Sequence, residues 1–197
     1  MTTDASIAHF DRLYRDDPDP WNYRTSDYER GKYAATLGAL AQPRYQSAIE
    51  AGCANGELGA RIATRCERYL GLDCAERAVV EARRRLAHLP QARVRRCHLP
   101  HAWPKRRADL IVLSEILYYL DPDELRALAG RVQRTLLTGG EIVIVNWTGE
   151  TDTPLSGRAA TGHFVTALEA CCRVTLARQE SGYDLVLLRC ARDGLSD

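Results

Sequence analysis

The sequence contains little that would place the chain in a membrane or on nucleic acid. No run of 18 apolar residues occurs in its 197 residues, so we expect no transmembrane helix. The first residues lack the basic and apolar regions of a secretory signal. The net charge of +1 offers no general attraction to nucleic acid. These absences predict a cytoplasmic protein without a nucleic-acid partner, and they leave its oligomeric state open.

The cysteines also lack any metal-binding pattern. There are seven of them, none forms a Cys-x-x-Cys pair, and Cys171 and Cys172 are adjacent. This spacing argues against a zinc site and against a disulfide framework. We therefore predict no metal site, and thiols that are reduced and mostly buried.

Strand-like and helix-like runs alternate from residue 47 onward, in a chain that is 45% hydrophobic. The strand-like runs are 47–51, 68–72, 92–97, 109–114 and 141–147, and the helix-like runs are 57–66, 75–88 and 123–137. Asp121 and Pro122 open the last helix as its N-cap and first residue. Since the run 110–113 is apolar on both sides, the pattern indicates a parallel sheet covered by helices on both faces.

The two ends of the chain differ from this alternating body. Residues 172–178 and 183–189 alternate about a turn at Gly182, which predicts an antiparallel hairpin. The prediction is a seven-stranded, mostly parallel α/β sheet closed by this hairpin. Residues 1–46 are expected to form a helical lid, and residues 47–197 are expected to form the main domain. Within the lid we expect a helix over 28–40 whose start is capped by Ser26 and Glu29.

A glycine-rich turn follows the first strand-like run, and the second run ends in Asp73. This arrangement is how an α/β sheet holds an adenosine cofactor, although a turn without a ligand remains an alternative. A dinucleotide site needs Gly-x-Gly-x-x-Gly, but the frame here reads Gly52-x-Ala54-x-x-Glu57, with a carboxylate where pyrophosphate would bind. S-adenosylmethionine has adenosine without phosphate, and its ammonium would favour an acid such as Glu50.

These segments resemble class I S-adenosylmethionine-dependent methyltransferases over about residues 47–190. Residues 50–56 resemble their first motif, 71–73 the second, 109–115 the fourth, and 136–140 the turn before strand five. The resemblance implies a Rossmann-like fold that binds S-adenosylmethionine and releases S-adenosylhomocysteine. A non-catalytic cofactor-binding subunit and a nicotinamide oxidoreductase are the alternatives from other classes.

A narrower resemblance is to the NodS-like methyltransferases, and it lies in residues 19–21, 26–33 and 114–120. Founding members of that family N-methylate the amino sugar of a deacetylated chitooligosaccharide. The resemblance implies an amine on a sugar or small metabolite as the methyl acceptor, with O-methylation of a similar metabolite as the alternative. No Asn/Asp-Pro-Pro-Tyr/Phe motif of nucleic-acid methyltransferases follows the fourth strand.

The resemblance also implies roles for individual residues. Asp73 is expected to bind the ribose hydroxyls. Glu50 and the Ser114 carbonyl are expected to bind the methionine ammonium, and Lys32 is expected to bind the cofactor carboxylate. The third strand ends without the usual acid, so we expect His98 or Leu99 to meet the adenine instead. The candidate proton acceptors are Glu115 and His163, and His163 lies in residues 148–164, which we expect to form a loop that shapes the acceptor site. The full set of expected cofactor-binding residues is Trp21, Tyr28, Lys32, Glu50, Gly52, Cys53, Asn55, Gly56, Asp73, Cys74, His98, Leu99, Ser114 and Tyr118.

Overall fold

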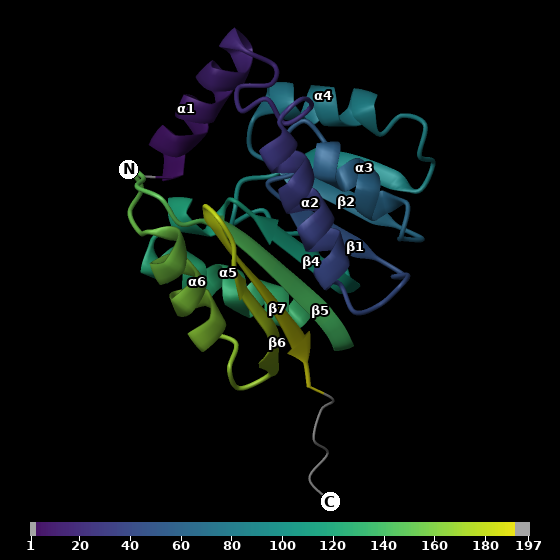
Figure 1. Ribbon diagram of the computed structural model, residues 1–197, viewed down its shortest axis with the longest axis vertical. Helices are drawn as coiled ribbons and strands as arrows, with labels where there is room; N and C mark the ends of the chain where they lie inside the picture. Colours follow the sequence, from purple (N-terminus) through teal and green to yellow (C-terminus); the bar gives the residue numbers. More distant parts are fainter. Residues whose placement is uncertain (1–2, 192–197) are drawn as a thin grey trace, which may run out of the picture.

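The computed structural model describes residues 3–191, and its centre is one seven-stranded sheet (Figure 1). The strands are β1 (Ala48–Ala51), β2 (Tyr69–Asp73), β3 (Ala92–Arg96), β4 (Ala108–Ser114), β5 (Leu136–Trp147), β6 (Cys172–Gln179) and β7 (Tyr183–Cys190). Their order in the sheet is β3-β2-β1-β4-β5-β7-β6. Only β7 runs antiparallel to its neighbours, which confirms the predicted mostly parallel sheet with a C-terminal hairpin.

Helices cover both faces of the sheet, as predicted. They are α1 (Thr3–Asp16), α2 (Asp27–Ala39), α3 (Glu57–Ala63), α4 (Glu76–Arg85), α5 (Pro122–Thr135) and α6 (Gly157–Thr166), with a short 3₁₀ helix η1 (Leu117–Tyr119). Alternate strand residues enter two separate cores: Leu110 and Val112 pack with α2, α3 and α4, whereas Ile111 and Leu113 pack with α5 and α6. The unbroken apolar run 110–113 is therefore explained by burial on both sides.

Local capping fixes where two of the helices begin. The Asp121 side chain accepts a hydrogen bond from the Glu124 N–H (2.8 Å), and the Glu124 side chain accepts one from the Asp121 N–H (3.0 Å). Ser26 caps α2 by accepting from the Glu29 N–H (3.2 Å). The Glu29 carboxylate does not return to Ser26 as in the predicted capping box, because it forms an ion pair with Lys32.

Three elements differ from the sequence-based expectation. Helix α1 was not predicted, and α6 lies in a segment that was expected to be a loop. Strand β5 starts at Leu136, directly after α5, so Gly140 lies inside the strand rather than in a turn before it. Ala108 pairs with Leu136 whereas Leu110 pairs with Glu141, so the register between β4 and β5 shifts here. This irregularity accommodates the residues by which β5 is longer than predicted.

The sheet order reverses at β1, which lies between β2 and β4. In open α/β sheets, ligands bind at the carboxyl ends of the strands at such a point. Helix α1 lies beside α4 near this end (Figure 1). The Asp11 side chain fixes it there by accepting from the Glu76 N–H (3.1 Å) and by pairing with Arg96 (2.8 Å). Within residues 3–191, no helix is long and apolar enough to cross a membrane.

Candidate active site

A cavity of about 680 Å³ lies at the carboxyl ends of β1, β2 and β4. Its size is that of a small-molecule site. Eight aromatic side chains line it: Phe10, Tyr14, Trp21, Tyr23, Tyr28, Tyr118, Tyr119 and Trp147. Its charged lining residues are Glu29, Lys32, Asp73, Glu115 and Asp152. Because four of these charged residues are carboxylates and one is a lysine, the lining favours a cationic occupant. The aromatic side chains favour an occupant with an apolar or ring-shaped body.

The glycine turn after β1 borders the cavity at Gly52. This residue has φ +75°, and a Cβ there would lie 2.2 Å from Cγ2 of Ile116, so only glycine fits. Gly56 has a different role from the one predicted. It has φ +85° at the N-cap of α3, where a Cβ would lie 3.1 Å from Cα of Ala82, and it does not line the cavity. Gly56 therefore allows α3 to pack on α4.

Asp73 ends β2 and lines the cavity. One carboxylate oxygen accepts from the Ala54 N–H (2.9 Å) and the other from the Ala75 N–H (3.0 Å). Burial raises the pKa of Asp73, and these backbone donors oppose the shift. The side chain is thus held rigidly toward the cavity, and each oxygen keeps a second lone pair for a ligand hydroxyl. Cys74 also lines the cavity, whereas Cys53 is buried beside the turn.

Glu50 does not line the main cavity, but it lines a small cavity that adjoins it behind the glycine turn, so its contact with the cofactor ammonium stays a prediction. Its carboxylate turns under the glycine turn, where it accepts from the Tyr69 hydroxyl (2.5 Å). The packing of α3 explains this orientation, because a Cβ on Gly59 would lie 2.9 Å from the Glu50 carboxylate. Glu50 is 1% exposed, and burial raises its pKa to about 7.

The raised pKa of Glu50 predicts a pH-dependent stability. The folded protein binds a proton on Glu50 up to about pH 7, whereas the unfolded chain releases it near pH 4.5. Stability from this group is therefore present at low pH and is lost as the pH rises through this window, by on the order of 3 kcal/mol. We expect Glu50→Gln to remove this loss. Thermal or urea unfolding of both proteins from pH 4.5 to 8 measures it, and a constant difference between them would contradict the assignment.

Glu115 is the centre of a hydrogen-bond network at the cavity wall. It follows β4 with φ +58°, and its carboxylate accepts from Lys32 Nζ (2.9 Å), the Tyr118 hydroxyl (2.8 Å) and the Trp147 N–H (2.9 Å). Burial and the nearby Glu115 raise the pKa of Tyr118, so its hydroxyl remains a donor. A carboxylate that is held by three donors is suited to orienting groups around it.

Lys32 lines the cavity and lies between two carboxylates, and its contact with a cofactor carboxylate stays a prediction. Its Nζ is 2.9 Å from an oxygen of Glu29 and 2.9 Å from an oxygen of Glu115. Burial alone would lower the pKa of Lys32, but the two carboxylates outweigh it and the pKa is raised. The ion pairs connect α2 to the end of β4.

Several other predicted residues do line the cavity. His98 and Leu99 lie after β3, and Ser114 ends β4. The His98 Nε2 atom is buried and has no hydrogen-bond partner in the part of the chain that the structure describes. Trp21 and Tyr28 form part of the wall and are 38% and 40% exposed.

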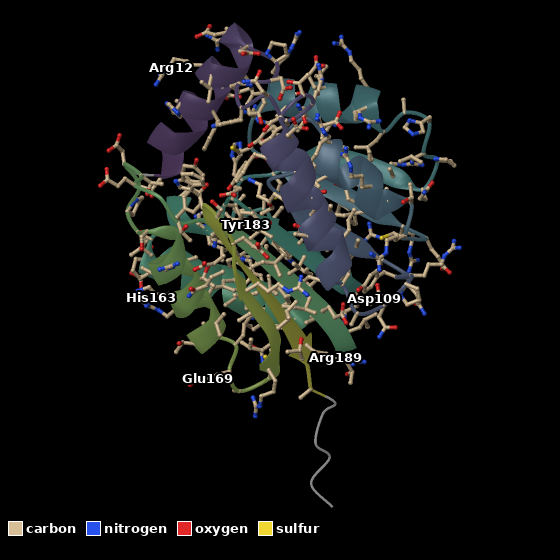
Figure 2. The ribbon with its side chains drawn as sticks, viewed as in Figure 1. Arg12, Asp109, His163, Glu169, Tyr183 and Arg189 are labelled. Carbon is tan, nitrogen blue, oxygen red and sulfur yellow. The ribbon has the colours of Figure 1, made fainter. Side chains whose placement is uncertain are left out.

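Two further predicted residues do not line the main cavity. His163 is exposed on α6, outside the cavity, and Figure 2 shows it at the periphery of the molecule. The loop expected around it is a helix, and this helix turns the imidazole toward solvent, so the geometry does not support its predicted catalytic role. Asn55 lines the small cavity that adjoins the main one, and its Nδ2 donates to Asp19 (2.9 Å) in the segment before α2.

Sequence reasoning missed the contribution of α1 and of Glu29. Phe10 and Tyr14 line the cavity from α1, and their spacing of four residues on one helix face is the signal that could have found them. Glu29 was interpreted as a cap residue, although its side chain lines the cavity. Among residues 3–191, no group of three or more His, Cys, Asp or Glu side chains could hold a metal ion.

Comparisons with known proteins place the chain in a family. The family model described as Nodulation protein S (NodS) matches residues 7–170. Nodulation protein S of Rhizobium tropici is 34% identical over 130 residues, which cover 64% of this chain and about half (53%) of that protein. Nodulation protein S of Bradyrhizobium diazoefficiens is 31% identical over 170 residues, which cover 85% of this chain and 80% of that protein.

Solved structures agree with this placement. A Pseudomonas syringae protein assigned to the methyltransferases is 38% identical, with a TM-score of 0.73, over 82% of this chain and 98% of that one. The N-methyltransferase NodS of Bradyrhizobium japonicum, in complex with S-adenosylhomocysteine, has a TM-score of 0.79 at 22% identity, over 96% of this chain and 99% of that one. With the class I methyltransferase fold and a match over residues 7–170, the chain belongs to the NodS family.

Proposed function

We propose that this chain is an S-adenosylmethionine-dependent methyltransferase that N-methylates an amine on a sugar or a small metabolite. The observation that carries the proposal is Asp73 at the end of β2, held toward the cavity by two backbone donors. It lies beside a turn that only glycine can form at Gly52. This pair at the reversal point of the sheet is the arrangement that binds an adenosine moiety.

The lining of the cavity fits S-adenosylmethionine. Asp73 would accept hydrogen bonds from the ribose hydroxyls, and His98 and Leu99 lie where the adenine would extend past β3. The Ser114 end of β4 and the turn at Gly52 would border the methionine part. The excess of carboxylates in the lining favours the positive sulfonium and ammonium of this cofactor. The related NodS of B. japonicum was solved with S-adenosylhomocysteine.

The cofactor supplies a methyl group that its sulfonium has already activated. The protein residues then have to exclude water and align the attacking amine, and such placement is worth roughly 7–11 kcal/mol. Glu115, fixed by Lys32 and Tyr118, would form the wall against which the acceptor is oriented. It is a positioning residue in this proposal, because its oxygens already accept three hydrogen bonds.

The same geometry favours an amine over a hydroxyl acceptor. A neutral amine can attack through its lone pair without a base, whereas a hydroxyl acceptor depends on a base to remove its proton. The two candidate bases are Glu115, which is engaged by donors, and His163, which lies outside the cavity. Tyr28 and Trp147 meet edge to face (6.3 Å between ring centroids) at one side of the cavity, and aromatic faces of this kind suit a sugar ring.

The segment 1–46 is proposed to act as a lid over the cofactor. Phe10, Tyr14 and Trp21 from this segment line the cavity. The segment is attached to the main domain at Asp19, which accepts from Asn55, and at Lys32, which pairs with Glu115. These contacts would have to open for the cofactor to enter.

Two measurements test the proposed function. We expect calorimetry to detect binding of S-adenosylhomocysteine and no binding of NAD, because Glu57 occupies the α3 N-terminus that a pyrophosphate would need. We then expect methyl transfer to glucosamine oligomers and none to their N-acetylated forms, in which the amine is blocked. Binding of NAD alone would refute the methyltransferase proposal. Equal transfer to both oligomers would refute the amine acceptor and favour O-methylation.

A further inference from the structure

A second, small cavity of about 30 Å³ lies behind the glycine turn. Gly52, Ala54 and Ser114 line both this cavity and the main one, so the two adjoin. Its volume is enough for a water molecule or for one small polar group of a ligand. Glu29, Asn55 and Glu50 are among its other lining residues.

Two buried acceptor atoms at this small cavity have no donor. They are Oε2 of Glu29 and Oδ1 of Asn55, and neither has a hydrogen-bond partner within residues 3–191. The orientation of the Asn55 amide is fixed, because its Nδ2 donates to the Asp19 carboxylate, which only accepts. A buried acceptor without a donor is costly. The small cavity therefore suits an occupant that donates hydrogen bonds to both atoms.

The charges around Glu29 indicate that this occupant is a cation. Lys32 pairs with Oε1 of Glu29 and with Oε1 of Glu115, while Oε2 of Glu115 accepts from Tyr118 and Trp147. The cluster of Glu29, Lys32 and Glu115 thus has two negative charges and one positive charge. The oxygen left over is Oε2 of Glu29, which is buried within a side chain that is 10% exposed. An ammonium group supplies both the missing charge and three N–H donors.

From this geometry we infer that Glu29 binds the amino-acid ammonium of the cofactor in the small cavity, together with the Asn55 side-chain oxygen. The inference rests on the proposed function. The ammonium is placed here because the turn at Gly52 and the end of β4 at Ser114 border both cavities, so a ligand with its ribose at Asp73 reaches the small cavity with its other end. Glu29 is thereby a cofactor-binding residue supplied by the N-terminal lid.

A ligand-by-mutant cycle tests this inference by calorimetry. The protein variants are wild type and Glu29→Gln, and the ligands are S-adenosylhomocysteine and its analogue without the amino group. We expect Glu29→Gln to weaken S-adenosylhomocysteine binding about 10- to 100-fold, as for a lost hydrogen bond to a charged group. The deaminated analogue should bind wild type and Glu29→Gln with affinities within about twofold of each other, because the group that Glu29 contacts is missing.

Glu141→Gln is the matched control, since Glu141 is also a buried carboxylate (1% exposed) with an unpartnered oxygen but lies outside both cavities. It should leave the ratio of the two affinities unchanged. The inference would be overturned if Glu29→Gln weakened the binding of both ligands equally. It would also be overturned if wild type bound both ligands with equal affinity, and this second result does not depend on whether the variant folds. Failure of wild type to bind S-adenosylhomocysteine at all would instead refute the proposed function.

Discussion

Asp73→Ala is expected to weaken the binding of S-adenosylhomocysteine at least about 100-fold. The carboxylate would accept both ribose hydroxyls, and hydrogen bonds to a charged group contribute about 1.5–3 kcal/mol each. The variant also removes the acceptor of the Ala54 and Ala75 N–H groups. We therefore expect a loss of stability of about 1–3 kcal/mol for each donor that becomes buried and unpaired.

Asp109→Ala separates these two effects, because Asp109 makes the same kind of contacts at the other end of the sheet. It accepts from the Gln46 N–H (2.8 Å) and the Ser47 N–H (2.7 Å), at the start of β4 (Figure 2). This control should lower the free energy of unfolding while the folded protein binds S-adenosylhomocysteine normally. Calorimetry measures the affinity of both variants for S-adenosylhomocysteine, and urea unfolding measures their free energies of unfolding. Unchanged affinity in Asp73→Ala, or an equal loss in both variants, would show that Asp73 does not bind the ribose.

The parts of the fold that the sequence predicted are those set by local pattern. Residues 110–113 are apolar on both sides because they enter two cores, and this requirement is visible without a structure. Asp121 and Pro122 open α5 through contacts within four residues. Asp73 was found because it directly ends an apolar strand. Each of these features depends on neighbours in sequence.

The side-chain partners that sequence reasoning did not predict depend largely on contacts between elements. Lys32 is 83 residues from Glu115, so no local pattern could show that its ammonium is already paired. Glu29 has the spacing of a capping box from Ser26, but its carboxylate pairs with Lys32 three residues on in the same helix, and Lys32 is itself held by Glu115 at the end of β4. Glu50 is in the expected motif, yet the packing of Gly59 turns its carboxylate toward Tyr69. Burial and ion pairing between elements decide these cases.

The surroundings of Glu57 disfavour a dinucleotide cofactor. Glu57 begins α3 and is held there by Arg85 (2.7 Å) and Arg61 (3.2 Å). These arginines lower the pKa of Glu57, against the opposing effect of burial. A charged carboxylate thus remains at the helix N-terminus, where it uses the position that a phosphate would otherwise occupy.

Glu115→Ala is the second change with a large expected effect. It removes one of the two carboxylates that pair with the buried Lys32, the acceptor of the Tyr118 hydroxyl and the acceptor of the Trp147 N–H. Glu29 still pairs with Lys32, so the cost comes from the donors that lose their acceptor. We expect the free energy of unfolding to fall by about 1–3 kcal/mol for each donor that is left buried and unpaired. Methyl transfer should fall as well, because Lys32 and Tyr118 lose the group that fixes them.

Glu115→Gln distinguishes a positioning role from proton transfer. Glutamine keeps the shape and one acceptor oxygen but cannot take up a proton from the amine. If Glu115 positions the acceptor, kcat in Glu115→Gln falls by about the same factor at every pH, and the pH profile keeps its shape. Loss of a pH-dependent limb of the profile would instead identify Glu115 as the base. Glu141→Ala is the control, because Glu141 is a buried acceptor for Tyr45 and Ala41 outside the cavity, and its loss should lower stability while kcat is unchanged.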